Sequence, residues 1–189
     1  MSRKLDYVVS GTSYMRFSNP GIAKDETNSQ IINMLIDKLV TDVHSHKFSM
    51  LYNGHTESSF GDRFTAYKDH VHEIHADSGG LQIVTQGMVI TDELKDKVYE
   101  NQAQWADVGM CFDEIPVVLT GDRSDRNDTK ARFFDFENYE ELARKTGRNV
   151  KRQLEIFDKA DSKCKPYIIL QGNCVDTYLR WYECLMEEV

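Results

Sequence analysis

The sequence lacks features that mark several common classes of protein. It has only three prolines and four cysteines in 189 residues, and no two cysteines form a Cys-x-x-Cys pair. Structural zinc sites usually need such close spacing, so zinc held by these four residues alone is not expected. We expect the cysteines to be reduced and mostly buried. They are Cys111, Cys164, Cys174 and Cys184.

Long apolar runs and an excess of positive charge are also missing. No stretch of about 18 or more apolar residues occurs, which excludes an apolar membrane-spanning helix. The N-terminus carries no apolar signal segment. The formal net charge of -8 excludes a protein that binds polyanions through its overall charge. We therefore expect a soluble intracellular protein in which any contact with nucleic acid rests on a local surface.

The apolar residues alternate between strand-like and helix-like patterns. Short apolar runs that end in turn residues predict buried strands, and apolar positions at helical spacing predict helices between them. This alternation predicts one α/β domain over residues 1–189, with a parallel sheet and helices outside it. The strands are expected near 7–11, 48–52, 71–76, 108–112 and 167–170, and the helices near 28–43, 92–106, 138–160 and from 175 onward.

One connection stands apart from this alternation. Residues 115–137 form a long polar stretch rich in Asp and Arg, and we expect a loop there. Loops of this length in a compact domain are commonly active-site lids, binding loops or disordered segments. Both a functional lid and a disordered segment agree with the sequence.

Polar side chains follow three of the expected strands. Asp77 and Ser78 come directly after the third, Asp113 and Glu114 after the fourth, and Gln171 after the fifth. In parallel α/β folds these strand ends converge on one face, where active sites lie. Each residue alone could be a turn or cap residue. Together, an Asp, an Asp and a Gln from three separate strands favour a binding site.

These side chains suit a guanine-like base. A carboxylate accepts hydrogen bonds, while an amide both donates and accepts, so Asp113 paired with Gln171 can read one edge of guanine. Gly79 and Gly80 let the backbone approach a flat ligand closely because no Cβ intervenes. Asp77 beside them can move a proton or support charge at a reacting sugar carbon, as carboxylates do at glycosidic bonds.

Three segments resemble the tRNA-guanine transglycosylase family. The segment His75-Ala76-Asp77-Ser78-Gly79-Gly80-Leu81-Gln82 is similar to the family's Asp-Ser-Gly-Gly-Phe-Gln signature. Cys111-Phe112-Asp113-Glu114-Ile115-Pro116 resembles its Phe-Asp-Glu-Cys-Pro segment, and Ile169-Leu170-Gln171-Gly172-Asn173 resembles its Gln-Gly-Gly strand end. The motifs occur in family order, and the resemblance runs from about residue 45 to the C-terminus.

The resemblance implies a (β/α)8 barrel that exchanges a guanine in a polynucleotide for a 7-deazaguanine, such as a preQ-type base. It implies that Asp77 is the general acid/base and that Asp113 and Gln171 bind the purine edge. The family's reaction passes through a covalent sugar–enzyme intermediate on a second Asp. The substrate-binding residues that it implies are Asp77, Ser78, Gly79, Gly80, Leu81, Asp113, Gln171 and Gly172.

The family's second Asp and its Cys/His zinc site belong to a later part of the barrel. We expect this chain to stop before both, with about five of the eight βα units present, so no cofactor is expected within it. At 189 residues the chain is also short for a barrel that typically needs about 250. We therefore expect a fragment, or a chain completed by a second polypeptide or by further copies of itself.

The motifs depart from the family pattern at three positions. Leu81, Ile115 and Asn173 stand where the family has Phe, Cys and a second Gly. These departures fit better the phage and bacterial enzymes that place 7-deazaguanines in DNA. We therefore favour DNA over tRNA as the substrate, and the cytoplasm of a bacterium or of a phage-infected cell as the location.

Basic residues gather on the expected helix near 138–160. They could meet a phosphate backbone, although a solvated helix face is the simpler interpretation. These residues are Arg144, Lys145, Arg148, Lys151 and Arg152.

Two other functions agree with the same sequence. A catalytically silent subunit could bind a deazaguanine without exchanging it, and the eukaryotic tRNA enzyme has a non-catalytic homologue as its partner. A barrel metallohydrolase could instead use Glu73, His75 and Asp77, which share one face of a strand, as metal ligands. His44 and His46 form the other candidate ligand pair.

Overall fold

A parallel five-stranded sheet forms the framework of the protein. The computed structural model describes residues 8–10, 48–55, 71–80, 89–120 and 131–189. The sheet has the order β1-β2-β3-β4-β7, so each strand lies beside the parallel strand that precedes it in the chain. The strands are Val8–Ser10 (β1), Phe48–Asn53 (β2), Val71–Asp77 (β3), Val108–Met110 (β4) and Lys165–Tyr167 (β7).

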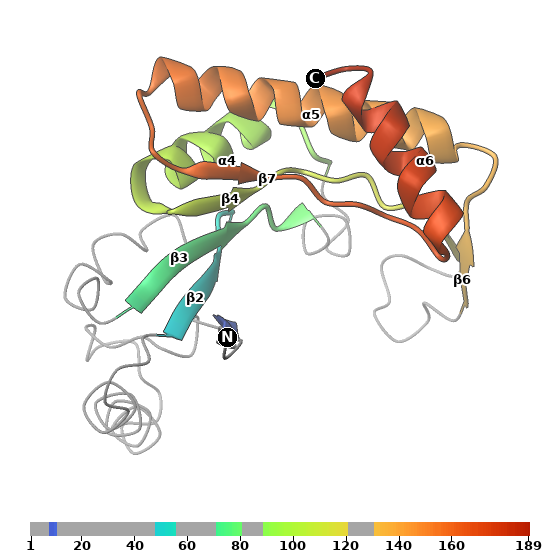
Figure 1. Cartoon of the computed structure of the whole chain (residues 1–189), viewed down its shortest axis with the longest axis horizontal. Helices are drawn as coiled ribbons and strands as arrows, with labels where there is room; N and C mark the ends of the chain where they lie inside the picture. The colour runs from blue at the N-terminus through green and yellow to red at the C-terminus, as the bar shows by residue number, and fades with distance from the viewer. Residues whose placement is uncertain (1–7, 11–47, 56–70, 81–88, 121–130) are drawn as a thin grey trace, which may run out of the picture.

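Three helices lie on one side of this sheet and follow one another in chain order (Figure 1). They are Asp92–Trp105 (α4), Tyr139–Lys159 (α5) and Val175–Met186 (α6). The Thr91 hydroxyl accepts a hydrogen bond from the Leu94 backbone N–H over 3.3 Å, so Thr91 is the N-cap of α4. No helix in the described part of the chain is long and apolar enough to cross a membrane.

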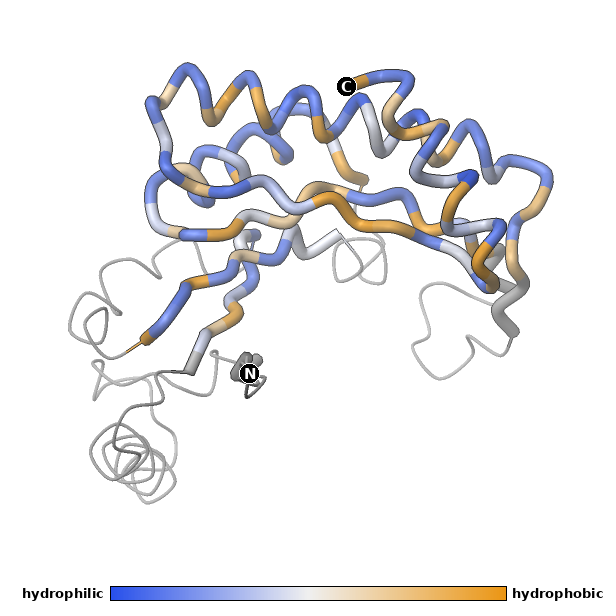
Figure 2. The backbone as a smooth tube through the Cα atoms, in the orientation of Figure 1, coloured by the Kyte–Doolittle hydropathy of each residue, from blue (hydrophilic) through white to orange (hydrophobic). Residues whose placement is uncertain are grey.

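Two apolar clusters hold the layers together, and burial of each large side chain contributes about 1.5–3 kcal/mol. The first lies between the sheet and helices α4 and α5, and includes Met50, Tyr52, Ile74, Val98, Tyr99, Phe112 and Phe157. The second lies between α5 and α6, and includes Cys111, Tyr139, Ala143, Val150, Trp181, Cys184 and Leu185. Figure 2 shows an apolar stretch of backbone that leads from β7 toward α6, and Ile168 and Ile169 of this stretch pack against the second cluster.

Two glutamines are buried between the helices and the sheet. Gln102 of α4 donates from Nε2 to the Met110 carbonyl over 2.9 Å and to the Ala76 carbonyl over 3.3 Å. Gln153 of α5 donates from Nε2 to the Gly109 carbonyl over 3.1 Å and to Gln102 Oε1 over 2.8 Å. A buried carbonyl without a partner is costly, so these amides stabilise the strand ends where ladder pairing stops.

The predicted parallel α/β arrangement is confirmed, with one strand displaced. The last strand is expected at 167–170 but lies at Lys165–Tyr167. Residues 168–170 leave the ladder because Ile168 and Ile169 pack against the cluster between α5 and α6, and the Trp181 indole donates to the Ile169 carbonyl over 3.2 Å. The helix expected at 28–43 lies outside the described residues.

The connection at 115–137 differs from the expected loop at both of its ends. Val117–Thr120 (β5) and Ala131–Phe134 (β6) pair antiparallel and form a separate two-stranded sheet. Valine and phenylalanine favour strands. The sequence pattern did not predict these two strands, because they are short and are separated by many charged residues. Residues 121–130, between the two strands, are not described.

The prediction of reduced and mostly buried cysteines is confirmed. Cys111, Cys164 and Cys184 are buried, and all four cysteines are free thiols. Cys174 is exposed because it occupies the N-cap position of α6, which lies at the surface.

Replacing Gly109 with alanine is expected to destabilise the protein. A Cβ here would lie 2.8 Å from Gln102 Oε1, 2.9 Å from Phe157 Cζ and 3.2 Å from Cys164 Sγ. Overpacking of this kind costs about 1–3 kcal/mol. Urea denaturation followed by circular dichroism should show that loss in the free energy of unfolding. Gly80→Ala is the control, because its nearest atom would be an ordinary 3.5 Å away. Equal losses in both variants would contradict this account.

Candidate functional site

Four successive parallel strands each place a carboxylate or amide side chain at the same end of the sheet. Asn53 ends β2 and Asp77 ends β3, and the two residues are register partners. Asp113 follows β4 and Gln171 follows β7. The structure therefore brings Asp77, Asp113 and Gln171 to one region, as the sequence predicts. Asn53 is a fourth member that the sequence interpretation missed.

Asp113 and Gln171 are in direct contact. Gln171 donates from Nε2 to Asp113 Oδ2 over 2.5 Å. Burial raises the pKa of Asp113, the hydrogen bond from Gln171 acts against this rise, and the neighbouring charges of Asp77 and Glu114 add to it. The carboxylate is therefore largely removed from water and already faces an amide donor.

The backbone that carries Asp113 is held by side chains of two helices. The Phe112 N–H donates to the Tyr99 hydroxyl over 3.1 Å, and the Phe112 carbonyl accepts from Asn149 Nδ2 over 3.0 Å. The Glu114 N–H donates to the Thr146 hydroxyl over 2.9 Å. These bonds replace the ladder partners that end with β4, so α4 and α5 position Asp113.

The backbone that carries Gln171 is held from α5 and α6. The Tyr139 hydroxyl donates to the Gln171 carbonyl over 2.9 Å, and it also contacts the Thr177 carbonyl. A Cβ on Gly172 would lie 2.9 Å from atoms of Thr177 and Tyr178, so only glycine allows this close approach to α6. The observed role of Gly172 is thus to bring the strand end against the helix.

The turn that carries Asp77 packs against β2. Gly79 has a positive φ of 75°, a conformation that favours glycine, and a Cβ there would lie 2.6 Å from Asn53 Oδ1, so any other side chain would also displace that of Asn53. Ser78 is buried, and its hydroxyl accepts from the Gly80 N–H over 3.3 Å. A Cβ on Gly80 would find room, so packing alone does not explain that glycine. Leu81, the other predicted pocket residue, lies outside the described residues.

The missed residue Asn53 had one usable signal. The pair Asn53-Gly54 predicts a turn at the end of a strand, because Asn and Gly are both common in turns. The structure shows that Gly54 donates its N–H to the Asp77 carbonyl over 2.9 Å, while the Asn53 side chain covers Gly79. The position of Asn53 at a strand end, as for the three predicted residues, would have identified it.

Asp77 and Asp113 have pKa values shifted in the same direction. Burial raises the pKa of Asp77, and hydrogen bonds from the backbone of Ser78 and Gly79 act against the rise. A carboxyl group whose pKa moves toward neutrality holds and releases a proton more readily at the pH of a cell. Perturbed carboxyl groups gathered at strand ends are typical of active sites, although structural networks also produce them.

The alternative metal site is not assembled in the described part of the chain. No group of three or more His, Cys, Asp or Glu side chains suited to a metal occurs there. Glu73 is instead paired with Lys165 Nζ at 3.0 Å, and it lies 3.4 Å from His75 Nε2 without the alignment of a hydrogen bond. His44 and His46 lie outside the described residues.

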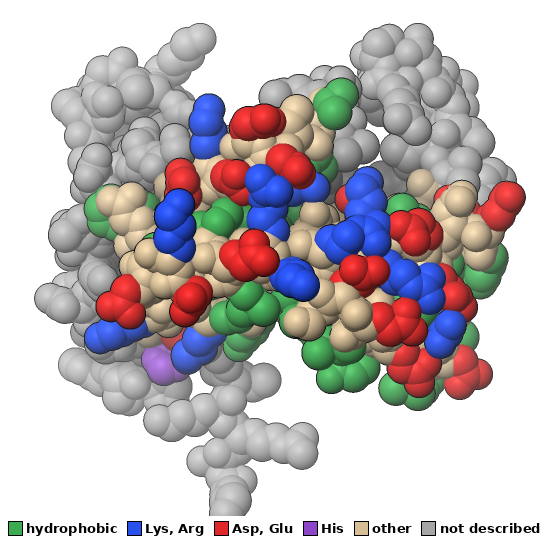
Figure 3. Space-filling view, turned by 90° about the horizontal axis from the view of Figure 1, so that it is seen from above, with side chains coloured by type: hydrophobic (Ala, Val, Ile, Leu, Met, Phe, Trp, Pro, Cys, Tyr) green, Lys and Arg blue, Asp and Glu red, His purple; other side chains and the backbone are tan. Residues whose placement is uncertain are grey.

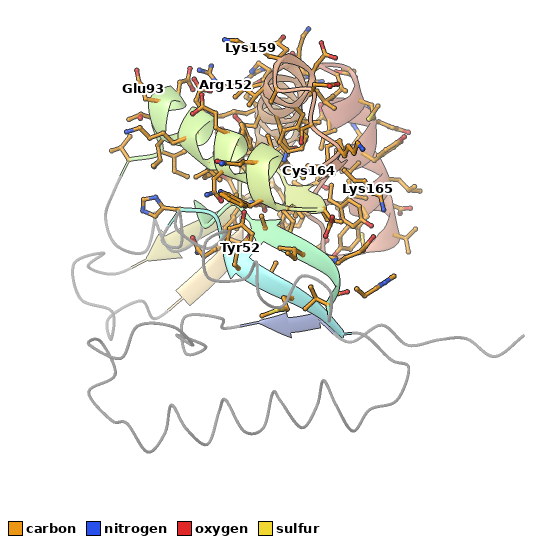
Figure 4. The ribbon with its side chains drawn as sticks, turned by 90° about the vertical axis from the view of Figure 1, so that its left-hand side faces the viewer. Tyr52, Glu93, Arg152, Lys159, Cys164 and Lys165 are labelled. Carbon is orange, nitrogen blue, oxygen red and sulfur yellow. The ribbon has the colours of Figure 1, made fainter. Side chains whose placement is uncertain are left out.

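The basic residues of α5 are largely neutralised by neighbouring carboxylates. Figure 3 shows Lys and Arg side chains interspersed with Asp and Glu over the helices, and Figure 4 shows Arg152 beside α4. This pairing favours a solvated helix face over a phosphate-binding surface. The pairs are Arg144–Glu187 at 2.9 Å, Lys145–Glu114 at 3.0 Å, Arg148–Glu141 at 2.6 Å and Arg152–Asp96 at 2.5 Å.

Comparison with known proteins gives no match to a family model, a curated protein or a solved structure. The functional argument therefore rests on the residues and contacts described above.

Asp77→Asn is expected to stabilise the protein at neutral pH. Because the folded pKa of Asp77 is raised, its favourable contribution is fully present below its ordinary value of 3.8 and is lost as the pH rises through the folded value. The free energy of unfolding should therefore be higher in the variant than in the wild type at neutral pH, and this gain should shrink toward acidic pH. Urea titrations at several pH values would measure it.

Glu100→Gln, at an exposed position in the middle of α4, is the matched control for this measurement. It also removes one carboxyl group, but from an exposed position, so it controls for the loss of one negative charge. An Asp77→Asn variant that is less stable than the wild type at neutral pH would contradict the proposed effect of burial.

Proposed function

We propose that this protein binds guanine-type bases at the strand ends and exchanges a guanine in a polynucleotide for a 7-deazaguanine. DNA is the favoured polynucleotide, on the departures from the tRNA-family motifs at Leu81, Ile115 and Asn173. The observation that carries the proposal is the hydrogen-bonded pair of Asp113 and Gln171 beside Asp77.

The Asp113–Gln171 pair matches the pattern of donors and acceptors on guanine. A carboxylate can accept from both the ring N–H and the exocyclic amino group, while the Gln amide donates to the neighbouring carbonyl. In the described structure Gln171 donates to Asp113 instead, so binding would exchange this contact for contacts to the base. A 7-deazaguanine has the same edge, so both bases of an exchange would fit one site.

Asp77 is proposed as the general acid/base. In the first half of the exchange, the second Asp that the resemblance implies bonds to the sugar carbon while the bond from that carbon to the base nitrogen breaks. The electron pair goes to the base, and protonated Asp77 supplies the proton that neutralises the leaving base. In the second half, the ring nitrogen of the incoming base displaces the second Asp from the sugar carbon and loses its proton to the Asp77 carboxylate. The raised pKa of Asp77 supports a group that can take both forms.

The wider fold is proposed to be part of a (β/α)8 barrel. Strands that pair in chain order, with their helices on one side, support this proposal, as does a site at the carboxyl ends of the strands. The second Asp for the covalent sugar intermediate, and the zinc site, are implied by the resemblance for a later part of such a barrel. A second polypeptide or further copies of the chain would complete it.

A binding protein without exchange activity is the second candidate. The two side chains proposed to read the base are both in this chain and in contact with each other. The sugar nucleophile, by contrast, is assigned to no residue of the matched motifs. Base binding and base exchange therefore need separate measurements.

Base binding is tested by calorimetric titration with guanine and with adenine. Guanine should bind better, because adenine offers an acceptor where guanine offers a ring N–H donor. Asp113→Asn should weaken guanine binding by about tenfold to a hundredfold, since hydrogen bonds to a charged group are worth about 1.5–3 kcal/mol. Glu100→Gln should leave the affinity unchanged. Equal guanine affinities of the wild type and Asp113→Asn would reject the proposed recognition.

Base exchange is tested by incorporation of radiolabelled guanine into DNA and, in parallel, into tRNA. Asp77→Asn should reduce the rate by about a hundredfold or more, which is the usual contribution of general acid–base catalysis. Its guanine affinity is measured beside the rate, so that loss of chemistry is separated from loss of binding. Guanine binding without exchange into either polynucleotide would favour the binding protein and contradict the enzyme.

A further inference from the structure

Helix α5 supports both of the residues that are proposed to read the base. Its buried face carries Tyr139 at the start and Thr146 and Asn149 further along. Tyr139 bonds to the backbone of Gln171. Thr146 and Asn149 bond to the backbone on either side of Asp113. One face of a single helix therefore fixes two strand ends that are 58 positions apart in the chain.

The support for Gln171 depends on one hydroxyl group. The ring of Tyr139 is buried between Phe134 and Trp181, with centroid distances of 5.3 Å and 5.1 Å. Its hydroxyl donates to the Gln171 carbonyl over 2.9 Å and also contacts the Thr177 carbonyl. Thr177 lies inside α6, where the helical ladder supplies a partner for its carbonyl, whereas Gln171 lies in neither a helix nor a strand. Removing the hydroxyl would therefore release the backbone of Gln171 and leave the ring packing in place.

The support for Asp113 comes from two polar side chains in the core. Thr146 is fully buried, and its hydroxyl accepts from the Glu114 N–H over 2.9 Å. Asn149 is also buried and donates from Nδ2 to the Phe112 carbonyl over 3.0 Å. Polar groups are costly to bury in a core unless they make such bonds. The two contacts fix the peptide groups before and after Asp113, and they are separate from the support for Gln171.

The two supported side chains suit different groups on the edge of guanine. A carboxylate accepts from the ring N–H and the exocyclic amino group, while an amide donates to the base carbonyl. Gln171 Nε2 and Asp113 Oδ2 are in contact at 2.5 Å, so the pair presents a donor and acceptors side by side. Displacing one backbone segment would disturb recognition of one group of the base and leave the other in place.

We propose that α5 sets the base specificity of the site through two separate supports. Tyr139 is the positioning residue for recognition of the base carbonyl, because it holds Gln171. Thr146, together with Asn149, positions Asp113 and thereby controls recognition of the exocyclic amino group. This inference rests on the proposed binding of guanine and deepens it, because it assigns the choice of base to residues that do not touch the base.

Two base analogues separate these supports. Hypoxanthine lacks the exocyclic amino group of guanine, and 6-thioguanine carries sulfur, a weak acceptor, in place of the carbonyl oxygen. Competition of each analogue against radiolabelled guanine, in equilibrium dialysis with the full chain, measures the two preferences. The wild type should prefer guanine over hypoxanthine by about tenfold to a hundredfold and over 6-thioguanine by about threefold to tenfold, because hydrogen bonds to a charged group are the stronger ones.

Tyr139→Phe and Thr146→Val are matched variants, because each removes one buried hydroxyl and nearly keeps the shape of the side chain. Tyr139→Phe should bring the preference over 6-thioguanine close to one and leave the preference over hypoxanthine unchanged. Thr146→Val should lower the preference over hypoxanthine by about threefold or more and leave the preference over 6-thioguanine unchanged. Thr146→Ser keeps the hydroxyl, so it should show both wild-type preferences.

Ser162→Ala is the control for loss of a hydroxyl far from the site. Ser162 donates to the Ala103 carbonyl over 2.7 Å and precedes β7, at the opposite end of the sheet, so its removal should change neither preference. Circular dichroism checks that each variant is folded. Should Thr146→Val fail to fold, Asn149→Ala takes its place, because it removes the donor to the Phe112 carbonyl.

Two results would overturn the proposed role of α5 while leaving guanine binding intact. One is that Tyr139→Phe and the Asp113-support variant both keep the wild-type preferences. The other is that either variant lowers both preferences equally, which would indicate general damage to the site. A wild-type chain that binds no guanine would overturn the proposed function and this inference together.

Discussion

The need to satisfy buried backbone groups where parallel strands end shapes the whole structure. Strand β4 pairs with β3 over only two residues and with β7 over three, and beyond it the chain is still buried. Buried carbonyl and N–H groups without partners are costly, so the helices supply partners from their side chains. Gln102 and Gln153 donate hydrogen bonds to backbone carbonyls of β4. The absence of a side chain on Gly109 leaves the space that the Gln102 side chain occupies.

Hydrogen bonds from helix side chains to the backbone also position the candidate site. Thr146 and Asn149 of α5 are polar and buried because they hold the backbone on either side of Asp113. Tyr139 does the same for Gln171. The helices therefore act as rigid supports for two residues that belong to no helix or strand. This arrangement lets Asp113 and Gln171 remain in contact although 58 positions separate them in the chain.

Part of the fold and of the site could be predicted, because local sequence patterns indicate where strands and helices lie and which polar residues follow the strands. Apolar periodicity located helices α4, α5 and α6 and the strands of the parallel sheet, with β7 displaced by a few residues, and polar residues after strands identified Asp77, Asp113 and Gln171. The hairpin of β5 and β6 was missed because its short strands lie in a charged segment. Asn53 was missed because Asn-Gly is an ordinary turn signal, and only the register of β2 with β3 places it beside Asp77.

The sequence by itself determined the alternation of strands and helices, the turn residues that end each strand, and the chemistry of the side chains there. Tertiary structure decided which of those side chains meet, because contacts between distant residues depend on strand order and register. It also decided that the cations of α5 are paired and that α6 has a second, uncovered apolar face. Helical periodicity shows which residues share a face, but only packing against neighbours shows which face is covered.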